Sequence, residues 1–130
     1  MALMVDTSVW IDFFRGNDTP EVERLEGYLQ GNEHIFTGDL ILSELLQGIR
    51  PGRELATFET AFKAFLVVEM VGETNARQSA GFYRHLRGQG ITVRKTIDCL
   101  IATWCILNHV PLLHADRDFD PFVSLGLEVA

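Results

Sequence analysis

Residues 1–14 read MALMVDTSVWIDFF, and they indicate the class of fold. Residues 1–5 are a short apolar run, which predicts a buried strand, and the run ends at Asp6. From residue 7 to residue 14, aromatic and aliphatic side chains recur at helical spacing. The chain therefore opens with a strand, an acidic residue and a helix, which is the order expected of an α/β fold with a ligand site at the carboxyl end of the strand.

The rest of the chain alternates helices and strands. Thr19 is expected to cap a helix that begins at Pro20 and runs to residue 29, and Asp39 to cap one that runs to residue 49. This alternation favours a parallel sheet with helices on both faces. We therefore expect one domain over residues 1–130, a three-layer α/β/α sandwich with a mostly parallel five-stranded sheet. The other helices are predicted at 53–65, 73–87 and 96–108, and the other strands at 34–37, 66–70, 111–113 and 127–129.

Composition and cysteine content limit the class of protein further. The 130 residues are 47% hydrophobic and 22% charged, as in ordinary globular domains. Cys99 and Cys105 fall in one predicted helix, about 9 Å apart along its axis, so they cannot form a disulfide with each other. No apolar run approaches the ~18 residues of a membrane span, and the apolar start is too short for a signal peptide. We expect a cytoplasmic protein with no membrane segment.

Four acidic residues stand out from their surroundings. Asp6 and Asp116 follow predicted strands, at the sheet edge where parallel α/β proteins bind ligands. Glu44 lies in a helix with almost no polar face, and a glutamate is almost never buried without a partner. Asp98 lies in the first turn of a helix that is apolar on nearly all sides. Taken singly, turn formation, helix capping and the helix dipole are alternative explanations for these aspartates.

If the four carboxylates meet, they require a cation. Two carboxylates 4 Å apart repel each other by roughly 4 kcal/mol even at an effective dielectric of 20. Mg²⁺ or Mn²⁺ fits best, because both take oxygen ligands and the sequence has no Cys or His at metal-binding spacing. We expect His114, close to Asp116, to be a hydrogen-bond partner rather than a ligand.

Each of the four acids lies in a short motif, and the motifs read VDTSVWID at 5–12, SELLQG at 43–48, DCLIA at 98–102 and LLHADRDF at 112–119. In order and spacing they resemble the acidic motifs of PIN-domain ribonucleases of the VapC group. The resemblance implies a Mg²⁺- or Mn²⁺-dependent endoribonuclease, the toxin of a VapBC toxin–antitoxin pair. It also implies an RNA substrate, a VapB-type antitoxin that blocks the site, and a homodimer. The residues that match the family's catalytic and metal-binding positions are Asp6, Glu44, Asp98 and Asp116.

The resemblance also suggests roles for auxiliary residues. Thr7, or alternatively Ser8, matches the small hydroxyl residue that orients the first aspartate. Asp118 belongs to the last motif, where it is expected to assist through a bound water. His114 stands where many relatives carry Thr or Ser. The expected chemistry is in-line attack of water on an RNA phosphodiester, with 5′-phosphate and 3′-hydroxyl products.

The net charge of −7 argues against a nucleic-acid substrate, unless cations neutralise the acids. The same fold without catalysis, an interaction scaffold, is one alternative function. A receiver domain is disfavoured because strand 66–70 carries Glu69 instead of a phosphate-accepting aspartate, and no lysine follows Lys95. A haloacid dehalogenase-type phosphatase is disfavoured because Ser8 stands where its second aspartate is required.

The cationic residues available for phosphate contacts are Arg15, Arg50, Arg53, Arg84, Arg87, Arg94 and Lys95.

Six aromatic residues recur near helical spacing in two of the predicted helices. Core packing is their ordinary explanation. Any of them that are exposed are expected to form a groove for an apolar helix of the antitoxin. They are Trp10, Phe13, Phe14, Phe58, Phe62 and Phe65.

Overall fold

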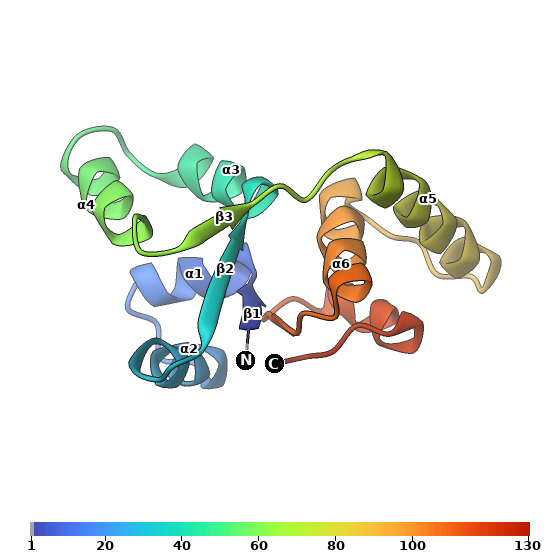
Figure 1. Cartoon of the computed structure of the whole chain (residues 1–130), viewed down its shortest axis with the longest axis horizontal. Helices are drawn as coiled ribbons and strands as arrows, with labels where there is room; N and C mark the ends of the chain where they lie inside the picture. Colours follow the sequence, from blue (N-terminus) through green and yellow to red (C-terminus); the bar gives the residue numbers. More distant parts are fainter. Residues whose placement is uncertain (1) are drawn as a thin grey trace.

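The computed structural model describes residues 2–130 and has the predicted α/β architecture (Figure 1). The strand predicted at 1–5 is confirmed from Ala2 onward, and Met1 lies outside the described residues. The elements, in chain order, are β1 (Ala2–Val5), α1 (Thr7–Phe14), α2 (Pro20–Gln30), β2 (His34–Gly38), α3 (Asp39–Gly48), α4 (Arg53–Phe62), β3 (Leu66–Val68), α5 (Glu73–Gly88), α6 (Thr96–Asn108), β4 (Leu112–Leu113) and the 3₁₀ helix η1 (Arg117–Leu125).

The sheet is parallel throughout, with the strand order β3-β2-β1-β4. It has four strands in place of the five that we predicted. The expected edge strand at 127–129 is reduced to a single parallel bridge between Leu112 and Val129. Leu112 exchanges hydrogen bonds there with Glu128 and Ala130, and β4 itself is only two residues long, so the ladder cannot extend.

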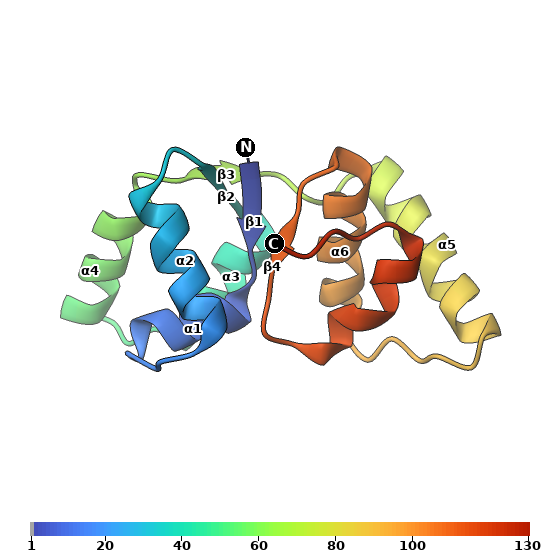
Figure 2. The ribbon, with the colours of Figure 1, turned by 90° about the horizontal axis from the view of Figure 1, so that it is seen from below.

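Helices cover both faces of the sheet, as predicted. Figure 2 shows α1, α2, α3 and α4 on one side of the strands and α5, α6 and η1 on the other. The largest side chains that are fully buried come from all three layers, and they include Trp10 of α1, Ile101 of α6 and Phe119 of η1. β1 is a central strand and β4 is an edge strand. The carboxyl end of β1 leads into the first turn of α1, and that of β4 leads to η1.

Local signals predicted most helix starts correctly, with one informative exception. The Oγ1 atom of Thr19 accepts a hydrogen bond from the backbone N–H of Val22, so Thr19 caps α2 as predicted. Asp39, which we expected to cap α3, is instead its first residue. Its carboxylate accepts hydrogen bonds from the backbone N–H groups of Leu40 and Met70. Asp39 therefore ties the end of β3 to the start of α3, a long-range role that the sequence does not reveal.

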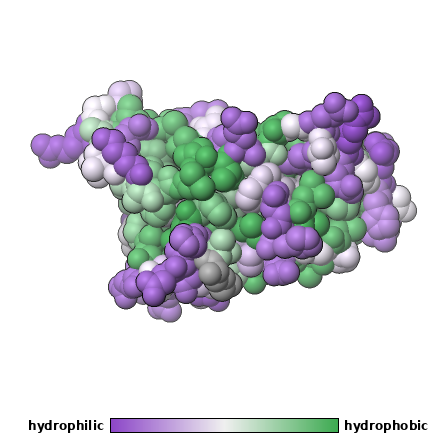
Figure 3. Space-filling model, viewed as in Figure 1, coloured by the Kyte–Doolittle hydropathy of each residue, from purple (hydrophilic) through white to green (hydrophobic). Residues whose placement is uncertain are grey.

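The free edge of the sheet is apolar. Leu66, Val67 and Val71 are 62%, 43% and 49% exposed, and Figure 3 shows hydrophobic side chains gathered on the face where α3 and β3 lie in Figure 1. An exposed edge strand with apolar side chains is a common site of pairing with another chain.

Within residues 2–130, every helix is too short or too polar to cross a membrane. Cys99 and Cys105 are both free and buried, in agreement with the sequence prediction.

Candidate metal centre

Asp6 lies at the carboxyl end of β1, where it caps α1. Its side chain is only 4% exposed. The Oδ2 atom accepts hydrogen bonds from the backbone N–H of Ser8, at 3.0 Å, and from the Ser8 hydroxyl, at 2.6 Å. Burial raises the pKa of Asp6, and the hydrogen bonds from Ser8 oppose this rise. The carboxylate is therefore fixed in direction but poorly solvated.

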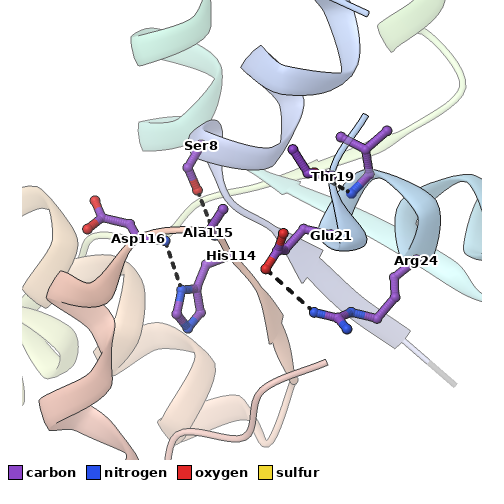
Figure 4. Close-up of polar contacts among 8 residues, drawn as sticks. Ser8, Thr19, Glu21, Arg24, His114, Ala115 and Asp116 are labelled. Carbon is purple, nitrogen blue, oxygen red and sulfur yellow. Dashed lines mark hydrogen bonds and ion pairs between the residues drawn. The ribbon is translucent and has the colours of Figure 1, made fainter. Parts of the chain in front are cut away.

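Ser8 joins the ends of two neighbouring strands. Its Oγ atom donates to Asp6. The same atom accepts a hydrogen bond from the backbone N–H of Ala115, at 3.1 Å, which Figure 4 shows. The sequence left open whether Thr7 or Ser8 orients the first aspartate, and the geometry selects Ser8. The hydroxyl of Thr7 donates instead to Oε1 of Glu44, at 2.9 Å. Consecutive residues of α1 thus hold two different carboxylates.

The Ser8→Ala variant is expected to be less stable than the wild type by about 1–2 kcal/mol, because it removes a partly buried hydrogen bond to Asp6 and an exposed one from Ala115. Thr7→Ala is a matched control, since it removes one hydroxyl from the adjacent position and a single hydrogen bond. Urea unfolding of the metal-free proteins measures both changes. A Ser8→Ala variant as stable as the wild type would show that the hydroxyl does not link β1 to β4.

Glu44 reaches the same region from α3. Its side chain is half-buried, and Thr7 is the partner that burial of a glutamate demands. Burial raises the pKa of Glu44, and the negative charge of Asp6 raises it further, while the charge of Lys95 lowers it. Glu44 and Asp6 therefore lie close enough for their charges to repel each other.

Asp98 lies in the first turn of α6. It is 5% exposed, and its Oδ2 atom is buried without a hydrogen-bond partner among the described residues. Burial is the largest cause that raises its pKa, from 3.8 to about 7, and the negative charges of Asp6, Asp116 and Glu44 add to the rise. The charge of Lys95 opposes it. A buried carboxylate oxygen with no donor is available to a cation.

The last motif brings two acids to Asp98. Asp116 caps η1, and its Oδ1 atom accepts from the backbone N–H of Asp118, at 2.9 Å. Asp98, Asp116 and Asp118 each offer an oxygen within 4.8 Å of the others. The Nδ1 atom of His114 accepts from the backbone N–H of Asp116, at 3.2 Å, so His114 is a hydrogen-bond partner, as predicted (Figure 4).

Asp98 experiences the negative charges of Asp6, Glu44 and Asp116, so the four predicted acids lie in one region. The compact group whose oxygens lie within 4.8 Å of one another consists of Asp98, Asp116 and Asp118, without Asp6 or Glu44. Asp118, expected to act only through water, offers an oxygen directly. The donor set consists of carboxylate oxygens, with a buried one still unpaired, and this fits a hard divalent cation.

An apolar groove begins beside Glu44. It runs between α1, α3 and α4 and encloses a volume of about 580 Å³. Of the predicted aromatic residues, Phe14, 44% exposed, and the buried Phe58 line this groove. Trp10 and Phe62 are buried and do not line it. The residues that line it are Ile11, Phe14, Arg15, Glu44, Leu45, Gly48, Ile49, Arg53, Glu54, Thr57 and Phe58.

The chain is similar to known proteins over nearly all its length. The model of the PIN domain matches residues 3–122. The chain is 31% identical to Ribonuclease VapC11 of Mycobacterium tuberculosis over 121 residues, which cover 91% of this chain and 89% of that protein. VapBC2 from Rickettsia felis, bound to a DNA fragment from its promoter, has a TM-score of 0.76 at 16% identity, covering 100% of this chain and 98% of that one. VapBC-5 from Mycobacterium tuberculosis has a TM-score of 0.70 at 24% identity, covering 98% and 96%.

Proposed function

This chain belongs to the PIN-domain family, with VapC ribonucleases among its relatives, and on this basis we propose how it acts on RNA. It is an endoribonuclease, the toxin of a toxin–antitoxin pair. It hydrolyses RNA phosphodiester bonds with the help of a divalent cation, Mg²⁺ or Mn²⁺. The cation is held by Asp6, Glu44, Asp98 and Asp116, with Asp118 beside them.

The observation that carries this proposal is the unpaired Oδ2 of Asp98. This atom is buried, and the charges of three other carboxylates add to the effect of burial in raising the pKa of Asp98. Ionised Asp98 is therefore unfavourable unless a cation is present. A bound divalent cation would acidify water and stabilise the negative charge that develops on the scissile phosphate. Asp6 is oriented by Ser8, and Glu44 by Thr7, so both carboxylates are preorganised.

Incubation with total bacterial RNA tests the proposal. We expect cleavage with Mn²⁺ or Mg²⁺ and none with EDTA, and products with 5′-phosphate and 3′-hydroxyl ends, because water rather than the ribose 2′-hydroxyl attacks. A 2′,3′-cyclic phosphate would contradict the mechanism. An interaction scaffold would show no Mn²⁺ binding by calorimetry and would cleave no RNA. That result would favour the alternative function.

For the antitoxin, we propose that an apolar segment lies in the groove between α1, α3 and α4. The groove exposes Phe14, and Glu44 at its end leads to the acidic site. An amphipathic helix laid into such a groove buries its apolar face and reaches the catalytic residues at the same time. The homodimer stays a prediction, and the apolar edge formed by Leu66, Val67 and Val71 is the surface that a second copy would cover.

The Gly48→Trp variant is expected to weaken antitoxin binding by at least about tenfold, because the new indole occupies space in the groove that the antitoxin segment needs. A Cβ at Gly48 meets nothing within 4 Å, so the substitution starts from open space, and the melting temperature of the variant checks that it folds. Gly27→Trp is the control, because Gly27 is equally open but lies on α2, outside the groove. Calorimetric titration with the antitoxin encoded beside this chain measures both. Equal affinities for the two variants would place the antitoxin elsewhere.

A further inference from the structure

Two cationic residues directly precede the first turn of α6. Lys95 is the N-cap residue of this helix, and Arg94 comes immediately before it. Both side chains are exposed. Asp98, the buried acid at the centre of the site, follows three residues after Lys95, so the helix that positions the acid also positions the two cations.

Lys95 lies within electrostatic reach of two acids from different layers. Its positive charge lowers the pKa of both Glu44, on α3, and Asp98, on α6. Because it caps α6 three residues before the buried Asp98 and is itself exposed, Lys95 lies at the border of the acidic site. As an exposed ammonium group on a flexible stem, it remains free to contact an anion that approaches from solvent.

Arg94 is held only loosely. Its Nε atom lies 3.9 Å from Oδ1 of Asp118, which is beyond hydrogen-bond distance, and its side chain is 78% exposed. By contrast, Arg77 on α5 forms an ion pair with Glu73 at 2.8 Å. The guanidinium of Arg94 can therefore turn toward a phosphate without breaking a hydrogen bond, and its planar donors suit phosphate oxygens.

An acidic nuclease must overcome repulsion between its substrate and its own surface. The chain carries a net charge of −7, and the site concentrates the negative charge further. Of the other cationic residues predicted to be available, Arg15 and Arg53 line the apolar groove, where the antitoxin is proposed to bind. Arg94 and Lys95 are the pair that the fold sets beside Asp98 and Asp118.

We propose that Arg94 and Lys95 bind RNA phosphates next to the scissile bond and so position the substrate over the acids. This inference rests on the proposed ribonuclease function and deepens it. The two residues act in substrate binding rather than in holding the cation. Their removal therefore raises KM, whereas loss of an acidic residue lowers kcat.

Cleavage kinetics of Arg94→Gln and Lys95→Gln test the inference, with the RNA species that the wild type cleaves in total bacterial RNA. We expect KM to rise about tenfold for each variant with kcat changed less than about threefold. The slope of log kcat/KM against log salt concentration should become shallower by about 0.7 for each phosphate that the variant no longer binds. Arg77→Gln is the control, because it also removes one exposed positive charge but lies on α5, and it should change KM by less than about twofold.

Two further measurements separate the possible failures. Mn²⁺ affinity by calorimetry should stay equal to the wild type or become tighter in both variants, which also shows that they fold. Arg94→Lys should restore most of the affinity for RNA, because the charge is retained. Wild-type cleavage together with an unchanged KM in both variants would overturn this inference alone. Absence of any wild-type cleavage would overturn the proposed function and the inference with it.

Discussion

The Asp98→Asn variant is expected to cleave RNA at least about a thousandfold more slowly than the wild type, yet to be more stable without metal at pH 8. Under the proposed function the variant lacks one ligand of the cation and so several kcal/mol of transition-state stabilisation, and each 1.36 kcal/mol is a factor of ten in rate. Stability rises because Asn is neutral. At pH 8 the wild-type carboxylate is ionised, 5% exposed and repelled by three neighbouring acids.

Asp120→Asn is the matched control for this prediction. Asp120 belongs to the same terminal segment as Asp116 and Asp118, but it is exposed and is not part of the acidic cluster. It should keep full activity and show a small change in melting temperature. Asp6→Asn should also abolish cleavage, but its stability is less informative because Ser8 donates two hydrogen bonds to that carboxylate. An Asp98→Asn protein that is clearly less stable at pH 8 would favour a structural role for this acid.

The second large effect is a loss of stability of the metal-free protein as the pH rises from about 4 to about 7. Asp98 has a pKa of about 7 in the folded protein, against an ordinary value of 3.8. Between these values the folded state binds the proton more tightly than the unfolded state. Protonated Asp98 therefore contributes fully to stability below pH 4, and this contribution is lost as the pH rises through 7. The free energy of unfolding falls by roughly 2–4 kcal/mol over this range.

Mn²⁺ should reverse this loss. A cation present at 100 times its Kd stabilises the folded state by about 2.7 kcal/mol. Because the cation competes with protons for the carboxylates, its effect should be larger at pH 8 than at pH 5.5. Melting temperatures measured with EDTA and with Mn²⁺ at both pH values test this. In Asp98→Asn the loss should be smaller by the contribution of Asp98, while Asp6 and Glu44, whose pKa values are also raised, keep theirs. A wild-type protein whose metal-free stability is flat over that range would exclude a strained acidic cluster.

Much of the candidate site was predictable because its residues are marked locally. Glu44 lies in a helix with almost no polar face, and Asp98 interrupts an otherwise apolar helix. Both positions are unusual for an acid without a partner. The four motifs together predicted the family, whereas the spacing of apolar residues predicted the alternation of helices and strands. The expected edge strand at 127–129 was wrong because a strand requires a partner, and β4 offers only two residues.

The hydrogen-bond partner of each side chain depends on long-range packing. Thr7 and Ser8 are adjacent hydroxyl residues, and the local sequence does not distinguish which of them donates to Asp6. Ser8 takes this role because β4 places the N–H of Ala115 beside it, while α3 brings Glu44 to Thr7. In the sequence Asp39 has the pattern of a helix cap. In the structure its carboxylate also accepts a hydrogen bond from the backbone N–H of Met70, beyond the end of β3.

The fold class, the four acids and the kind of cation they suit follow from the amino-acid sequence alone, because burial pattern and ligand chemistry are properties of short segments. Three-dimensional packing was needed to bring Asp118 to Asp98 and Asp116, and to set Arg94 and Lys95 at the border of the same acids. These are contacts between segments distant in the chain. Their geometry depends on how β1, α6 and η1 pack against one another, which no local pattern specifies.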